Sequence, residues 1–156
     1  MNLSFDEHLE ILRRLLAHNV DFMIIGGYAV IHHGYSRTTG DMDIWLKPDN
    51  DNKERLIAAL TDVGFDDDGL QAVKAFDFTM HHIFSLSIEP QPVEFLTHIS
   101  GIDYTTAAKQ ISSFPMDDIS VPFIHLNHLV LSKMSTGRAK DKADVEELQK
   151  LMKKRY

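Results

Sequence analysis

The sequence predicts an α/β fold, in which a small mixed β-sheet is flanked by helices and followed by a helical C-terminal segment. Short apolar, β-prone runs at residues 22–25 and 42–46 predict strands. Longer segments with apolar residues at helical spacing separate such runs, and they prevail from about residue 125 to 153. A chain of 156 residues suits one domain, which we place over residues 1–156.

Composition excludes several classes of protein. The sequence has no cysteine, which rules out a disulfide framework and a thiolate zinc site. No apolar run approaches the roughly 18 residues of a membrane span, and the first residues do not resemble a signal peptide, so we expect a cytoplasmic protein without membrane contact. The net charge of −7 argues against a broad surface for duplex nucleic acid, although it does not exclude a nucleic-acid end held at a local site.

The first elements lead to a glycine pair. Residues 4–18 predict a packing helix, because apolar residues recur there at helical spacing. The strand at 22–25 then runs into Gly26 and Gly27, and a helix-like run follows over 28–33. At a strand-to-helix turn, backbone N–H groups and the helix dipole favour an anion, and glycine lets a phosphate approach closely. A glycine pair alone is more often a plain turn.

The next strand, over 42–46, carries carboxylates on one face. Alternation places Asp41, Asp43 and Trp45 on that face and apolar residues on the other. The two carboxylates, roughly 7 Å apart at their Cα atoms, suit joint binding of a hard cation. Mg²⁺ takes one or two protein carboxylates and keeps places for water and substrate phosphates. For an isolated Asp-x-Asp, a solvated strand edge is the commoner explanation.

Between the two motifs lie an arginine and a histidine pair. Arg37 could contact a substrate phosphate, because a guanidinium forks well onto phosphate oxygens, or it could pair with Asp41 or Asp43. His32 and His33 are adjacent, so on a helix they point about 100° apart. Packing or capping therefore explains these histidines better than joint metal ligation.

The middle of the chain supplies further strands and helices. We expect helices over 53–63 and 104–110, strands over 75–80, 83–88 and 93–96, a solvated acidic turn over 66–69, and an edge strand with a proline over 119–124. Within 93–96, Glu94 is an acidic residue in an apolar run. It has either a functional role or an exposed place at a strand edge.

Two helices, over 125–135 and 139–153, form the C-terminal segment. Lys133 falls on the apolar stripe of the first helix, so it needs an anion or a route to water. We expect a mainly structural ion-pair network, made by Arg138, Lys140, Asp141 and Asp144.

Taken together, the glycine pair and the Asp-x-Asp resemble the pattern of the nucleotidyltransferase superfamily, which includes DNA polymerase β and kanamycin nucleotidyltransferase. That pattern is Gly-Gly or Gly-Ser at a strand-to-helix turn, a spacer, Asp-x-Asp or Asp-x-Glu, and a third acidic residue on a later strand. The fuller string is similar to the small bacterial AbiEii-like branch and to minimal nucleotidyltransferases of toxin–antitoxin loci. The matched residues are Gly26, Gly27, Ala29, Gly34, Arg37, Thr39, Asp41 and Asp43.

The resemblance implies a nucleotidyltransferase-like fold and an enzyme that transfers a nucleoside monophosphate from a nucleoside triphosphate to a hydroxyl acceptor. It implies Mg²⁺ or Mn²⁺ as cofactor and pyrophosphate as the second product. The implied metal ligands and catalytic residues are Asp41, Asp43 and Glu94. The implied nucleotide contacts are Gly26, Gly27, Arg37, Thr39 and Lys133. Glu94 departs from the aspartate that the resemblance usually shows, and its longer side chain changes the reach of the carboxylate.

Several alternatives stay open at this point. The acceptor could be a small molecule, a protein hydroxyl or a tRNA end. A different class of function is a catalytically inactive module that senses nucleotides or binds a partner, for instance half of a toxin–antitoxin pair. Two observations are compatible with that alternative: a glutamate at position 94 in place of the usual aspartate, and the small size of the chain. A protein partner or a homo-oligomer is compatible with either function.

Overall fold

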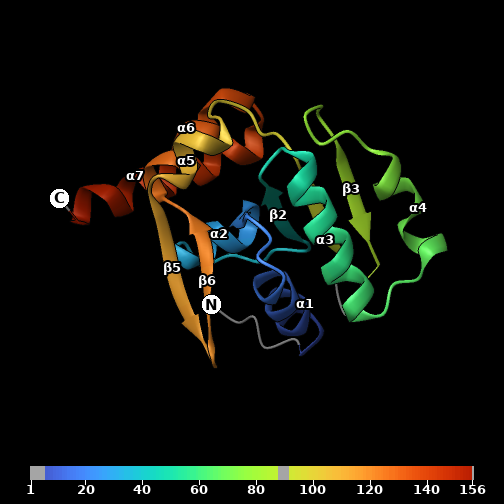
Figure 1. The fold of residues 1–156 in the computed structure, drawn as a ribbon. Coiled ribbons are helices and arrows are strands. Elements are labelled where there is room, and N and C mark those ends of the chain that lie inside the picture. Colours follow the sequence, from blue (N-terminus) through green and yellow to red (C-terminus); the bar gives the residue numbers. More distant parts are fainter. Residues whose placement is uncertain (1–5, 88–91, 156) are drawn as a thin grey trace.

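A computed structural model describes residues 6–87 and 92–155 (Figure 1). Six strands form one mixed sheet in the order β3-β4-β2-β1-β6-β5. The central strands are β1 (Phe22–Ile25), β2 (Met42–Leu46), β4 (Val93–Leu96) and β6 (Ile119–Ile124), and the edges are β3 (Ile83–Leu86) and β5 (Ile111–Met116). The pairs β1–β6 and β2–β4 are parallel, and the other three pairs are antiparallel. The predicted α/β fold with a small mixed sheet is confirmed.

Seven helices surround this sheet in the described residues. They are α1 (Asp6–Ala17), α2 (Gly26–His32), α3 (Asn50–Val63), α4 (Asp67–Ala75), α5 (Tyr104–Ala108), α6 (Leu126–Thr136) and α7 (Ala139–Arg155). α1 packs on α3, α3 contacts α4, and α6 pairs with α7. In Figure 1, α6 and α7 lie together at the top of the view, and the end of α7 projects away from the sheet. The predicted helical C-terminal segment is therefore present.

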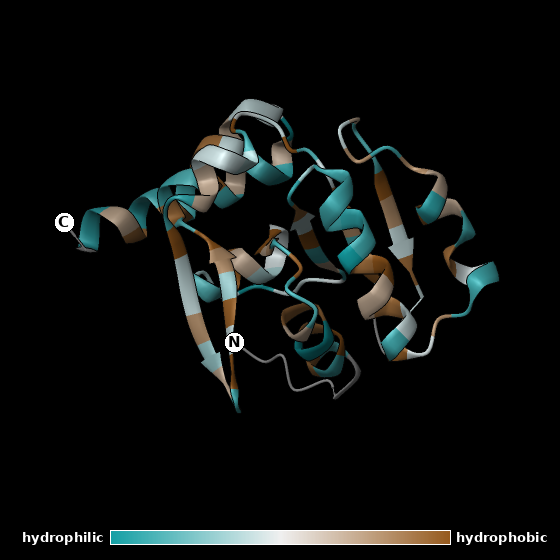
Figure 2. Ribbon diagram, in the orientation of Figure 1, coloured by the Kyte–Doolittle hydropathy of each residue, from teal (hydrophilic) through white to brown (hydrophobic). Residues whose placement is uncertain are grey.

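The hydrophobic core includes residues from both faces of β2. Met42, Ile44 and Leu46 are fully buried on one face, as their alternation predicts. Trp45 lies on the face that carries Asp43, and its ring meets Tyr104 of α5 edge-on at 5.1 Å. Figure 2 shows the complementary pattern, because the outer side of α3 and most of α7 are hydrophilic whereas β3 carries a hydrophobic segment.

The adjacent histidines at the end of α2, His32 and the C-cap His33, take part in packing, as expected. The His32 ring stacks on Phe123 at 4.1 Å, and its Nε2 lies 2.9 Å from the Ser112 hydroxyl. The Nε2 atom of His33 lies 2.7 Å from the carbonyl oxygen of Ile124, which accepts the hydrogen bond. Both side chains thus tie α2 to β5 and β6.

Two helix starts differ from the sequence prediction because aspartates cap them. Asp49 accepts a hydrogen bond from the backbone N–H of Asn52 at 2.7 Å, so α3 begins at Asn50 and not at residue 53. Asp66 accepts from the backbone N–H of Gly69 at 2.8 Å and starts α4. The solvated turn predicted over 66–69 is therefore wrong, since acidic residues stabilise the first turn of a helix. At the N-terminal end α1 begins at Asp6, and residues 4 and 5 of the predicted helix lie outside the described residues.

The strand predictions need three corrections. Residues 75–80 form no strand: α4 runs to Ala75, and turns follow that bury Phe78 and bind its N–H to Asn50. The strand predicted over 83–88 ends at Leu86, and residue 88 lies outside the described residues. β6 is not an edge strand, because β5 pairs with it on one side and β1 on the other. β5 itself was not predicted, since its serines and Pro115 give a weak strand signal.

Candidate active site

Two carboxylates lie opposite each other on neighbouring strands. Asp43 of β2 is the register partner of Glu94 of β4, and the parallel pairing directs both side chains to the same face of the sheet. Asp41 precedes β2 and is exposed. Burial, followed by the charges of Glu94 and Asp41, raises the pKa of Asp43 to about 7, although Lys133 and Lys140 act in the opposite direction. The three predicted acidic residues therefore form one electrostatically coupled group.

The glycine pair begins α2 directly beside this group. Gly26 has a φ of +68°, which favours glycine, and a Cβ built there would overlap the Asp43 carboxylate. A Cβ on Gly27 would overlap the side chain of Thr39. The absence of side chains thus allows the Asp43 carboxylate and the Thr39 hydroxyl to lie against the backbone at the start of α2.

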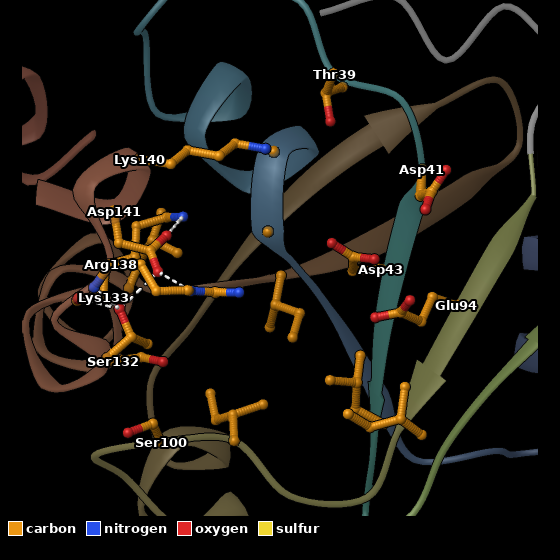
Figure 3. Close-up of a pocket in the computed structure, with 18 of the residues that line it drawn as sticks. Thr39, Asp41, Asp43, Glu94, Ser100, Ser132, Lys133, Arg138, Lys140 and Asp141 are labelled. Carbon is orange, nitrogen blue, oxygen red and sulfur yellow. Dashed lines mark hydrogen bonds and ion pairs between the residues drawn. The ribbon is translucent and has the colours of Figure 1, made fainter. Parts of the chain in front are cut away.

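These residues line a cavity of about 680 Å³. Figure 3 shows Asp41, Asp43 and Glu94 on one side of it and Lys133, Arg138, Lys140 and Asp141 on the other. The cavity is also lined by the predicted nucleotide contacts Gly26, Gly27, Arg37 and Thr39. The structure therefore brings all the predicted site residues to a single cavity. Its acidic wall comes from β2, β4 and the residue before β2, and its cationic wall from α6, α7 and the link between these helices.

Lys133 on the cationic wall is held by two buried carboxylates. Its ammonium nitrogen lies 3.0 Å from Asp141 Oδ1 and 3.0 Å from Asp144 Oδ2. Burial opposes the ionisation of Asp141, but hydrogen bonds from Thr136, Lys133 and Arg138 lower its pKa to about 2. The predicted ion-pair network is confirmed for Arg138, Asp141 and Asp144.

Lys140 does not belong to that network. Its side chain is exposed, lines the cavity, and makes no ion pair with any described residue. In Figure 3 it extends away from its helix. Lys140 is thus a cation on this wall without a paired carboxylate among the described residues. The prediction that it belongs to the ion-pair network is wrong. Lys133 and Lys140 lie on separate helices with a break at Gly137 between them, so no periodicity in the sequence marks the direction of Lys140.

Arg37 pairs with neither Asp41 nor Asp43. Its Nε lies 3.0 Å from Asp144 Oδ1, and its Nη2 donates to Asp144 Oδ2 at 3.1 Å. The carboxylate is 3% exposed and the guanidinium side chain 15%, so the pair is largely removed from water. The second alternative for Arg37, pairing with the motif aspartates, is therefore wrong, and the residue instead joins the loop before β2 to α7.

One end of the cavity was not foreseen from the sequence. It is formed by Ile83 on β3, Leu96 on β4 and the segment 98–100 that follows β4. Ile83 is the register partner of Leu96. This pair lies two residues along the strands from the pair Ser85 and Glu94, on the same face of the sheet. Because an edge strand reaches its neighbour only through tertiary pairing, no local motif in the sequence marks these residues as part of the site.

The donor set suits a hard cation. Within residues 6–87 and 92–155, no three His, Cys, Asp or Glu side chains are arranged to hold a metal ion. Mg²⁺, however, commonly takes only one or two protein carboxylates and completes its shell with water and substrate phosphates. Asp43 and Glu94 oppose each other in a half-buried place, where burial and, after it, the charge of Glu94 raise the pKa of Asp43. A cation between these oxygens would offset both effects, so the acidic wall fits Mg²⁺ or Mn²⁺.

Comparison with known proteins gives a family and a fold. The family model described as "Nucleotidyltransferase of unknown function (DUF6036)" matches residues 3–154. A search among curated proteins finds no match. Among the helices of the described residues, none has the length and apolar character that crossing a bilayer requires.

Two solved structures share the fold at low sequence identity. The lincosamide antibiotic adenylyltransferase LnuA, solved with lincomycin bound, is 16% identical with a TM-score of 0.58, and the match covers 97% of this chain and 99% of that one. A putative nucleotidyltransferase from Thermotoga maritima is 15% identical with a TM-score of 0.59, over 94% and 90% of the two chains. The narrower resemblance to the AbiEii-like branch stays a prediction.

Proposed function

Because this chain belongs to the family of nucleotidyltransferases whose model it matches almost end to end, we propose that it transfers a nucleoside monophosphate from a nucleoside triphosphate to a hydroxyl acceptor. The observation that carries the proposal is the cavity between the two walls. Asp43 and Glu94 face each other on the sheet, and Lys133, Arg138 and Lys140 lie across from them.

The cationic wall suits the triphosphate. An ammonium group has three donors, and Lys133 uses two of them for Asp141 and Asp144, so one is left for a phosphate oxygen. Lys140 adds a charge that no carboxylate neutralises among the described residues, and Arg138 is largely exposed beside it. Gly26, Gly27 and Thr39 border the same space and offer backbone N–H and hydroxyl groups.

The acidic wall suits the reacting centre. Asp41 and Asp43, with Glu94, would hold Mg²⁺ or Mn²⁺, which when bound neutralises phosphate oxygens and favours ionisation of the acceptor hydroxyl. Glu94 would take the proton of that hydroxyl as general base. The acceptor oxygen forms a bond to the α-phosphorus, the bond to the bridging oxygen of the β-phosphate breaks, and pyrophosphate leaves with the electron pair. Arg37, through Asp144, would position the loop that carries Thr39 and Asp41.

The acceptor is best sought among small molecules. The neighbour LnuA is an adenylyltransferase for a lincosamide antibiotic, which sets a precedent on the same fold. The chain's net charge of −7 disfavours a long polyanionic acceptor. Lincomycin is therefore a sensible first compound in an acceptor screen with α-labelled nucleotides.

A thermal-shift panel tests the proposal. ATP, GTP, CTP and UTP are each added with and without Mg²⁺ to the wild type, to Asp41→Asn/Asp43→Asn, and to the control Asp51→Asn/Asp68→Asn, which removes two exposed aspartates away from the cavity. Each shift is measured against the same variant without ligand. We expect a Mg²⁺-dependent rise of several degrees in the wild type and the control only, because a ligand that binds the native state stabilises it. No rise with any nucleotide in the folded wild type would contradict the proposal.

A further inference from the structure

The end of the cavity beside Glu94 differs from the rest in chemistry. On the cavity face of the sheet, the row Asp43–Glu94–Ser85 is followed by the row that contains Leu96 and Ile83. Ile83 is 66% exposed although it is a large apolar residue on an edge strand. Together with His98 and Ile99, these residues form what we call the β3–β4 subsite: Ile83, Leu96, His98 and Ile99.

The hydrogen bonds around Thr97 fix the state of His98. The Thr97 hydroxyl donates to the carbonyl oxygen of Met80 at 2.8 Å, so its oxygen can only accept from His98 Nδ1, 2.9 Å away. The proton therefore sits on Nδ1, and Nε2 is left as an acceptor. Burial and the neighbours His81 and His82 lower the pKa of His98, which keeps the ring neutral at neutral pH. The ring also stacks on His81 at 4.0 Å.

The subsite contains no group that would bind an anion. The cations that line the cavity are Arg37, Lys133, Arg138 and Lys140. They come from the loop before β2, from α6 and α7 and from the link between these helices, and none comes from β3, β4 or residues 98–100. The adjacent charges are the carboxylates of Asp43 and Glu94. A nucleic-acid end would place phosphates here without the Lys or Arg contacts on which such binding depends.

We propose that the β3–β4 subsite binds the acceptor, and that this acceptor is an uncharged small molecule with an apolar body and at least two hydroxyl groups. This inference rests on the proposed function. The apolar body lies over Leu96 and Ile83, one hydroxyl reaches Glu94, and a second donates to His98 Nε2. In-line displacement supports the placement, because the attacking oxygen must approach from the side away from the pyrophosphate, and the cationic wall holds the pyrophosphate on the far side of the cavity.

A titration followed by ¹H–¹⁵N NMR tests the subsite with two simple probes. Phenyl β-glucoside has an uncharged apolar ring and several hydroxyls, whereas phenyl phosphate has the same ring with an anion. We expect the glucoside to shift the amide signals of Ile83, Leu96 and residues 98–100, and phenyl phosphate to leave them unchanged. No shift with the glucoside, or a stronger shift with phenyl phosphate, would overturn the proposal, and the second result would indicate an anionic acceptor.

Variants separate the subsite from the nucleotide site. Ile83→Glu should weaken glucoside binding by about tenfold and leave the thermal shift with Mg²⁺ and ATP as in the wild type. His98→Phe keeps a ring against His81 and removes the acceptor, so a smaller loss is expected. Ile111→Glu on the other edge strand is the matched control, because Ile111 is also exposed. Unchanged glucoside binding in Ile83→Glu, or loss of the nucleotide shift there, would assign Ile83 another role.

The two proposals fail differently. If the wild type shows no shift with nucleotide but binds the glucoside at these residues, the proposed transfer fails and the subsite can no longer be called an acceptor site. If nucleotides bind and the glucoside does not, the transfer reaction stands and the assignment of the acceptor class fails.

Discussion

Arg37 and Asp144 are 107 residues apart in the sequence and form a two-point ion pair, with Nε–Oδ1 and Nη2–Oδ2 distances of 3.0 and 3.1 Å. Asp144 also binds Lys133, so one carboxylate of α7 joins the loop before β2 to α6. The side chain of Asp144 therefore connects the cationic wall to the loop that carries Asp41.

Removal of the guanidinium should destabilise the whole protein. Arg37→Met leaves the buried Asp144 with Lys133 alone, and loss of one partner from a buried pair costs about 3 kcal/mol. We expect the melting temperature to fall by about 6–12 °C. The control is Lys150→Met, which breaks the exposed Glu147–Lys150 pair on the same helix and should change the melting temperature by at most about 2 °C. Equal effects of the two substitutions would contradict a structural role for the Arg37–Asp144 ion pair.

The stability of the ligand-free protein should depend on the ionisation of Asp43. Its pKa in the folded state, about 7, lies above the ordinary value of 3.8, so the folded protein binds this proton more tightly than the unfolded chain. This contribution to stability is complete below about pH 4 and is lost as the pH rises to about 7. Asp43→Asn mimics the protonated form, so its melting temperature should exceed that of the wild type by a smaller margin at about pH 5 and by several degrees more at about pH 8.5.

Thermal melts at both pH values, without divalent cations, check this prediction. The control is Asp68→Asn, an exposed position whose effect on the melting temperature should be the same at both pH values. A wild type that gains stability relative to Asp43→Asn on going to alkaline pH would show that the pKa of Asp43 is not raised in the folded protein.

Space at Gly27 should limit substitution there. A Cβ on Gly27 would overlap the Thr39 side chain, so Gly27→Ala should cost on the order of 2 kcal/mol from overpacking. Nothing lies within 4 Å of a Cβ on Gly40, and Gly40→Ala is therefore the matched control in the same region. The double variant Gly27→Ala/Thr39→Gly should recover part of the loss in a thermal melt. A Gly27→Ala protein as stable as the Gly40→Ala control would refute the steric argument.

Lys140 should bind nucleotide without supporting the fold. Because it makes no ion pair among the described residues, Lys140→Ala should keep the melting temperature of the ligand-free protein. Loss of its charge should raise the Kd for Mg²⁺ and ATP by about tenfold, as for one charged hydrogen bond. Lys142→Ala is the control, an exposed lysine of α7 that does not line the cavity. Isothermal titration of the wild type and the two variants with ATP and Mg²⁺ measures the Kd of each protein. Equal Kd values for Lys140→Ala and Lys142→Ala would exclude a role for Lys140.

The motif residues at the centre of the site could be predicted from the sequence, but the long-range contacts that hold them could not. The glycine pair follows β1, and Asp41 and Asp43 lie just before and within β2. The apolar patterns of these two strands are local and strong, and both begin and end at the predicted residues. The partner of Arg37 could not be found in this way, because Asp144 is close only after α7 packs on α6. Two carboxylates near in sequence were the obvious candidates, and a distant one made the contact.

Weak or misleading local signals account for the other differences. The aspartates at 66–68 suggested a solvated turn, yet one of them caps α4 and the others sit in its first turn, where the dipole favours negative charge. Residues 111–116 of β5 contain serines and a proline, and their strand conformation comes from pairing with β6. The apolar end of the cavity depends on the register between β3 and β4, which no motif encodes.

The ion pair between Arg37 and Asp144 also ties completion of the site to a segment that is synthesised late. A ribosome that has released the chain up to residue 130 has delivered the glycine pair and all three carboxylates of the acidic wall, but neither Lys133 nor the aspartates of α7. At that point the loop of Thr39 and Asp41 still lacks its anchor, Asp144. Because α6 and α7 complete the cavity, a chain made only to that point holds its carboxylates without the cations that would draw a triphosphate to them.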